Sequence, residues 1–99
     1  MSKNDWITYL SLLSAIKFNG GGHLNHEFFW EGLAPIKEGG GQHPDESTEL
    51  RQLIDKEWSS VEGFQKFFNE RTASISGSGW GWLTYNKSTG QLEYIQTKN

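Results

Sequence analysis

Residues 76–95 read SGSGWGWLTYNKSTGQLEYI, and this stretch decides the fold class. Residues 79–85 alternate with a period of two, which is typical of a β-strand and places both of their tryptophans on one face. Residues 86–90 are rich in turn-forming types, and a second strand begins at Leu92. The stretch therefore predicts an antiparallel β-hairpin.

The residues before the hairpin have helical spacing. A broad apolar stripe runs from Trp6 to Ile16. Three consecutive glycines follow at residues 20–22, and each costs about 1 kcal/mol relative to alanine inside a helix. Local rules alone place a break there, but the helical spacing resumes beyond the glycines and ends at residues 32–35. We therefore expect one long helix that contains the glycines.

Two shorter helices are expected between the long helix and the hairpin. Residues 36–47 have the composition of an exposed loop, and residues 50–58 return to a helical period. Ser59 and Glu62 form a capping-box pattern that predicts the start of the next helix. The fold class is α+β: a long N-terminal helix, two shorter helices, then a β-hairpin from an incomplete antiparallel sheet. Two strands alone are marginal, so the remaining strand is expected outside this chain.

Composition excludes several classes of function. The chain has 99 residues, a formal net charge of -3 and no cysteine. It has no basic patch to neutralise phosphates, so neither nucleic acid nor a membrane is expected as a partner. Thiolate metal sites and disulfides are impossible without cysteine. Residues 1–13 have neither the basic and apolar regions of a secretory signal nor the arginine-rich composition of a mitochondrial presequence, so no targeting signal is evident.

One histidine stands out as a possible metal ligand. Phe18, Gly22, His26 and Trp30 are each four residues apart and so form one stripe on a helix. A neutral imidazole binds manganese, iron or zinc, and an apolar surrounding controls solvent access to the ion. Spacing alone does not establish a metal site, because a lone histidine between aromatic residues is more often a hydrogen-bonded histidine of the core or surface.

Two other interpretations stay open on residue patterns alone. His23, His26 and His43 could form a three-histidine zinc site, although no carboxylate accompanies them at a motif spacing. His43 lies in a glycine-rich loop and is more simply solvated. Trp80 and Trp82 alternate with glycines, which suits either a tryptophan-rich core strand or close approach of another group.

Two motifs carry a resemblance to a known family. The string KFNGGGHLNH at residues 17–26, followed by Phe29-Trp30, resembles the first motif of manganese-type enzymes in the iron/manganese superoxide dismutase family. The string GSGWGWL at residues 77–83 resembles the second. The resemblance covers residues 14–99, which it identifies as a partial superoxide dismutase unit: the end of a helical hairpin and the first part of the α/β C-terminal domain. Residues 1–13 are expected to be a non-family N-terminal segment.

The resemblance assigns roles residue by residue. It makes His26 a metal ligand. It also makes Phe18 and Trp80 the aromatic residues that form walls of the active site. It makes His23, Trp30 and Trp82 residues that surround the ligands and pack around the site without binding the ion. The iron-type branch commonly has glutamine where this chain has Gly21, so manganese is the expected metal, with iron possible.

The implied activity is disproportionation of superoxide to oxygen and hydrogen peroxide at a single manganese or iron ion, as protection against oxidative stress. The family binds its ion with three histidines and one aspartate, and only His26 has a counterpart here. We therefore expect a truncated form that holds no catalytic ion by itself. The family forms homodimers or homotetramers, and the mitochondrial matrix or the cytoplasm is the expected compartment. The alternative is a non-enzymatic structural or interaction module of the same fold, but the retained His26 and Trp80 favour the enzyme.

Overall fold

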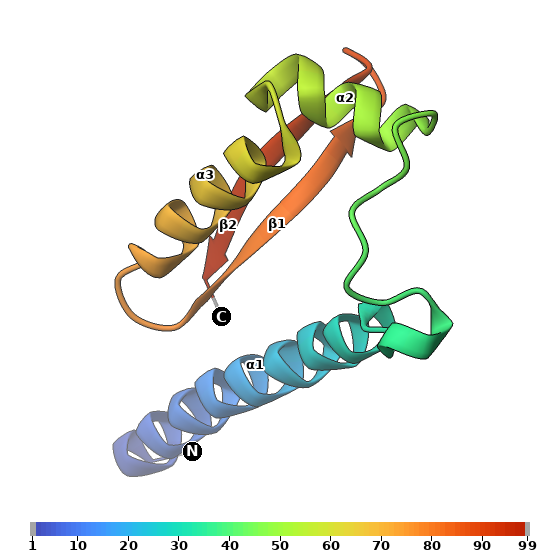
Figure 1. Ribbon diagram of the computed structural model, residues 1–99. Helices are drawn as coiled ribbons and strands as arrows, with labels where there is room; N and C mark the ends of the chain where they lie inside the picture. The colour runs from blue at the N-terminus through green and yellow to red at the C-terminus, as the bar shows by residue number, and fades with distance from the viewer. Residues whose placement is uncertain (1, 99) are drawn as a thin grey trace. The chain divides into compact units, whose positions relative to one another are not determined.

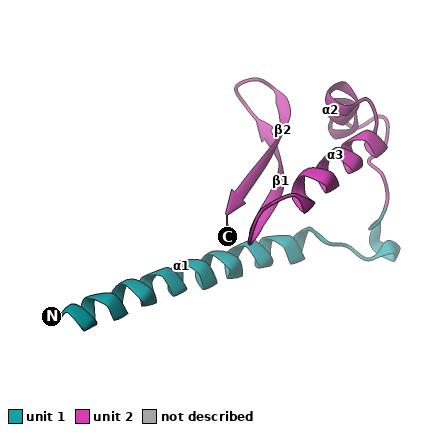
Figure 2. Ribbon diagram, turned by 90° about the vertical axis from the view of Figure 1, so that its left-hand side faces the viewer, with its two compact units in different colours: residues 1–41, 99 teal, residues 42–98 magenta. Residues whose placement is uncertain are grey.

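A computed structural model describes residues 2–98. These residues form the helices α1, α2 and α3, one 3₁₀ turn and the strands β1 and β2 (Figure 1). They fall into two compact units, one within residues 1–41 and one comprising residues 42–98 (Figure 2). The expected α+β class, with a long N-terminal helix before the other elements, is confirmed.

The first unit is dominated by α1, which runs without interruption from Lys3 to Gly32. It begins with a capping box, in which the Asp5 N–H donates to the Ser2 Oγ and the Ser2 N–H donates to the Asp5 carboxylate. Hydrogen bonding to its carboxylate, from the Ser2 side chain and then from the Ser2 backbone N–H, lowers the pKa of Asp5. The glycines at residues 20–22 stay helical, so the prediction of one continuous helix is confirmed. Among residues 2–98, no helix has both the length and the apolar character that crossing a bilayer requires.

The second unit begins with two short helices joined almost directly. After the 3₁₀ turn at Ile36–Glu38, which belongs to the first unit, α2 spans Glu49–Trp58 and α3 spans Val61–Ala73. Thr48 caps α2 by accepting a hydrogen bond from the Arg51 N–H. Both helices lie where the spacing of apolar residues predicted them.

The predicted start of α3 is wrong by one residue. Ser60, not Ser59, is the N-cap, and its Oγ accepts a hydrogen bond of 2.9 Å from the Gly63 N–H. Ser59 instead ends α2 in the left-handed region, with φ of 70°. The chain must leave one helix and enter the next within two residues. A left-handed residue followed by an extended one, Ser60 with φ of -160°, achieves this reversal.

The two serines should therefore respond differently to substitution. We expect Ser60→Ala to destabilise the second unit by about 0.5–2 kcal/mol, because the Gly63 N–H loses its acceptor. Ser59→Gly should change stability by less than about 1 kcal/mol, because glycine adopts positive φ without steric cost. Thermal unfolding followed by circular dichroism measures both. Equal losses in Ser59→Ala and Ser60→Ala would contradict the assigned cap.

The hairpin forms as predicted. Strand β1 spans Gly79–Asn86 and pairs antiparallel with β2, which spans Gln91–Lys98. The Gly90 N–H closes the turn by donating to the Asn86 carbonyl at 2.8 Å. Gly90 has φ of 70°, a conformation that favours glycine. Among the described residues the sheet has these two strands alone.

The core of the second unit lies between the helices and one face of the hairpin. Ile54 from α2, Val61 from α3 and Leu92 from β2 are buried, with exposed fractions of 2%, 4% and 7%. Partly buried apolar residues pack around them: Leu53, Trp58, Phe64 and Leu83. Leu83 and Leu92 share a face of the sheet with Tyr94, whereas Trp80 and Trp82 lie on the opposite face. The tryptophan pair therefore lies outside this core.

Candidate metal centre

His26 is held on α1 by a hydrogen bond to its own helix. Its Nδ1 lies 2.8 Å from the carbonyl oxygen of Gly22, one turn earlier. A carbonyl can only accept a hydrogen bond, so Nδ1 carries the proton and donates. In a neutral imidazole the lone pair is then on Nε2. A histidine ligand commonly uses such a bond from its other ring nitrogen to fix tautomer and orientation, so His26 is suited to bind a metal through Nε2.

The neighbours of His26 on α1 are aromatic. The Trp30 ring lies 6.0 Å from the His26 ring, centroid to centroid, at an interplanar angle of 31°. Phe29 packs edge-on against Trp30 at 5.1 Å. Phe18 lies two turns before His26 on the same helix, a rise of about 12 Å. The helix thus brings His26 and Trp30 together, while Phe18 lies farther along the stripe.

The other two histidines have separate partners. His23 Nε2 lies 3.2 Å from the Glu27 carboxylate, and its side chain is 69% exposed. His43 Nδ1 lies 3.8 Å from the Glu62 carboxylate in the second unit. Within residues 2–98, no group of three or more histidine or carboxylate side chains converges to hold a metal ion. This geometry gives no support to a three-histidine zinc site.

Trp80 and Trp82 form a stacked pair on β1. Their ring centroids are 5.8 Å apart, with an interplanar angle of 24°. The Trp82 Nε1–H donates a hydrogen bond of 2.7 Å to the Thr97 Oγ1 on β2. Sequence reasoning missed Thr97, although the hairpin register could have identified it, because Thr97 is paired with Trp80 across the strands. The two indoles thus form one ordered aromatic surface.

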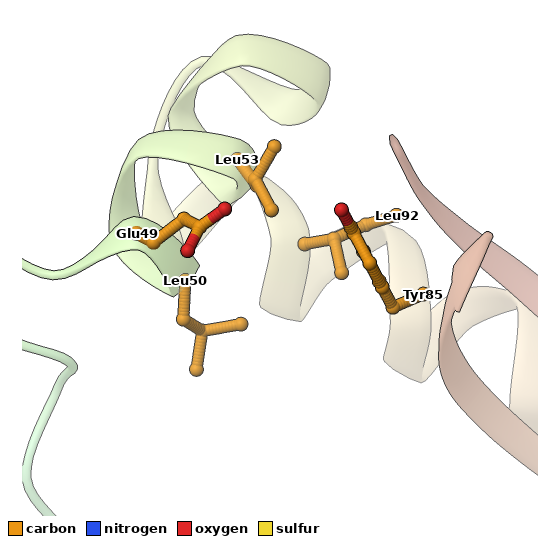
Figure 3. A pocket seen from close by; sticks show the side chains of 5 residues that line it. All are labelled: Glu49, Leu50, Leu53, Tyr85 and Leu92. Carbon is orange, nitrogen blue, oxygen red and sulfur yellow. The ribbon is translucent and has the colours of Figure 1, made fainter. Parts of the chain in front are cut away.

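A groove of about 330 Å³ lies between α2 and the hairpin (Figure 3). Its lining is mainly apolar, from Leu50, Leu53 and Leu92, with the Glu49 carboxylate and the Tyr85 phenol as its polar groups. None of these residues is among the predicted site residues. One carboxylate and one phenol beside leucines do not supply the ligand number of a metal site, so we assign no catalysis to this groove.

The fold and the oriented His26 imidazole together define a class of protein. It is an α+β protein in which one histidine nitrogen is suited to bind a transition metal. Residues 46–99 match a protein-family model, that of the C-terminal domain of iron/manganese superoxide dismutases. The chain belongs to the iron/manganese superoxide dismutase family, as its two motifs predicted.

Individual relatives agree with this assignment. The chain is 46% identical to an iron superoxide dismutase of Tetrahymena pyriformis over 97 residues, covering 98% of this chain and 50% of that protein. It is 52% identical over 90 residues to a mitochondrial manganese superoxide dismutase of Schizosaccharomyces pombe, covering 91% of this chain and 40% of the relative. A mitochondrial manganese enzyme of Arabidopsis thaliana aligns over all 99 residues at 46% identity, covering 42% of its own length. The chain thus spans half or less of each of these relatives.

Proposed function

We propose that this chain contributes one ligand and part of the aromatic wall of a superoxide dismutase centre. The centre converts superoxide to oxygen and hydrogen peroxide. The observation that carries the proposal is the hydrogen bond from His26 Nδ1–H to the Gly22 carbonyl, which fixes the tautomer that has its lone pair on Nε2. Relatives at 46% and 52% identity are named superoxide dismutases, so a purely structural module is not favoured.

The residues present fit such an ion only in part. His26 would hold it through Nε2, and when bound the ion supplies a redox couple for taking up and returning one electron. Phe18 and Trp80 would wall the site, while His23, Trp30 and Trp82 would pack around it and limit water access. One imidazole is too few for tight binding, so the other ligands must come from polypeptide other than residues 2–98.

Relatives of both metal types support either manganese or iron. We propose manganese, because Gly21 occupies the position where the iron-type branch commonly has glutamine. The matrix of mitochondria or the cytoplasm is the proposed compartment, since several relatives are named mitochondrial. A homodimer or homotetramer is the proposed assembly of the whole protein. Residues 14–99 are the proposed superoxide dismutase unit, although the Arabidopsis alignment also includes residues 1–13.

A chimaeric enzyme tests the function. The segment of the S. pombe enzyme that aligns over 90 residues would be replaced by the matching part of this chain. We expect a soluble protein that holds about one manganese or iron per subunit and dismutes superoxide. Metal is measured by mass spectrometry, and activity by inhibition of cytochrome c reduction. A chimaera that folds but binds no metal would refute the proposal.

The isolated chain provides the complementary measurement. With one ligand of the required set, the 99-residue protein is expected to show neither stoichiometric metal nor activity. Metal and activity in the isolated chain would show that its centre is completed in another way, for example within an assembly. Equilibrium dialysis against Mn²⁺ or Fe²⁺ followed by metal analysis distinguishes these outcomes.

A further inference from the structure

A small hydrogen-bond network ties the end of α3 to β2. The Thr72 hydroxyl lies 2.9 Å from the Tyr94 hydroxyl. The side-chain amide of Gln96 donates to the Tyr94 hydroxyl at 3.2 Å and to the Arg71 carbonyl at 3.0 Å. Tyr94 and Gln96 lie on the sheet face that packs against the helices, opposite Trp80 and Trp82. The network and the tryptophan pair therefore lie on opposite faces of the hairpin.

Gly81 is the point where this network touches β1. A Cβ at residue 81 would overlap the Thr72 Oγ1 and lie 3.0 Å from the Tyr94 hydroxyl. Glycine alone therefore lets the two hydroxyls lie directly against the strand. The backbone conformation does not explain this glycine, because Gly81 is not among the residues with positive φ.

The Tyr94 side chain has little freedom to move away. Its ring packs edge-on against Phe67 at 5.6 Å and against Phe68 at 5.3 Å, both from α3. Such edge-to-face contacts favour one ring orientation. The Tyr94 hydroxyl is thus held in place, and it lies directly against β1 at Gly81.

We infer that Thr72 and Tyr94, acting through Gly81, are positioning residues for the stacked pair Trp80–Trp82. Gly81 is the residue between the two tryptophans, so any displacement of its backbone moves both indoles on the opposite face. The relevance of this arrangement to catalysis rests on the proposed function, in which Trp80 walls the metal site. Residue misplacement of about 1 Å can cost up to about 100-fold in turnover, so such support affects rate without contact with substrate.

The first test uses the 99-residue chain and needs no metal. Two stacked indoles give an exciton couplet in circular dichroism, which Trp82→Phe would identify by removing it. We expect Gly81→Ala to lose most of the couplet, because the added methyl overlaps the Thr72 hydroxyl. Adding Thr72→Ala to Gly81→Ala should restore part of it, since that change removes the overlapping atom but also the hydrogen bond between Thr72 and Tyr94. Gly21→Ala is the matched control, because its Cβ would meet no atom within 4 Å.

Tyr94→Phe keeps the inference testable if Gly81→Ala fails to fold. This variant retains the ring contacts with Phe67 and Phe68 and removes only the hydroxyl, so it should fold with a weakened couplet. An unchanged couplet in Tyr94→Phe, or a Gly81→Ala loss that Thr72→Ala does not partly restore, would overturn the inference.

The chimaeric enzyme separates this inference from the proposed function. There, Gly81→Ala should lower turnover by about 10- to 100-fold while metal content stays constant, and the double variant with Thr72→Ala should recover part of the turnover. A parent chimaera without metal would refute the function, yet the couplet measurements would still decide whether the network positions the tryptophans. Normal turnover in Gly81→Ala, with a metal-loaded parent, would refute the catalytic part of the inference alone.

Discussion

Ile54→Ala is expected to unfold the second unit, residues 42–98. The Ile54 side chain is 2% exposed and belongs to a core of three buried residues. Removing a buried isoleucine side chain to the β-carbon costs about 2–5 kcal/mol, from lost burial and from the cavity left behind. A core this small rarely supplies more than about 3–5 kcal/mol, so the substitution removes most of the stability.

The measurement is urea unfolding followed by far-ultraviolet circular dichroism and tryptophan fluorescence. Trp58 reports on the same region, because it packs against this core. Ile36→Ala is the control, since Ile36 is 80% exposed and should change stability by no more than about 0.5 kcal/mol. An Ile54→Ala protein with the parental transition midpoint would show that the core is placed wrongly.

His26→Ala in the chimaera should abolish stoichiometric metal binding and, with it, dismutation. Loss of an outer-shell partner of a ligand typically weakens a metal site by 10- to 100-fold, and loss of the ligand should weaken it by at least about 100-fold. The structural reason is the fixed tautomer: the 2.8 Å bond to the Gly22 carbonyl holds the proton on Nδ1, so Nε2 is the ring nitrogen that carries the lone pair.

His43→Ala is the matched control for this experiment. His43 is a histidine whose imidazole lies near the Glu62 carboxylate, but it lies in the loop before α2 and has no proposed role in the metal centre. Its removal should leave metal content and activity unchanged. Stoichiometric metal in His26→Ala, or equal losses in both variants, would contradict the assignment of His26 as a ligand.

Much of the fold could be predicted from residue patterns because the decisive signals are local. The alternation in residues 79–85 and the turn residues that follow specify the hairpin without knowledge of the helices. The continuity of α1 through residues 20–22 needed the helical spacing on both sides, because the propensity of the glycines argues against it. The cap of α3 could not be assigned correctly, since Ser59 and Ser60 are chemically identical and only their backbone angles distinguish them.

The two motifs predict a set of site residues but not the geometry of a site. The first motif predicts His26 as a ligand, whereas the tautomer of His26 depends on a carbonyl that comes within reach only once the helix forms. The contact between Thr72 and Tyr94 joins residues 22 positions apart in the chain, and neither lies in a motif. Such a contact depends on how α3 packs on the sheet, which residue patterns do not specify.

The bond from His26 to Gly22 has a consequence for the motions of α1. The acceptor carbonyl belongs to the last of three glycines, where backbone entropy makes the helix easiest to open. Amide hydrogens around residues 20–24 should therefore exchange with solvent faster than those of the flanking turns. Each opening also releases the imidazole from its acceptor. The orientation of His26 Nε2 is thus coupled to local opening of the helix. A bound ion that holds the ring in place would therefore also slow hydrogen exchange at the glycines.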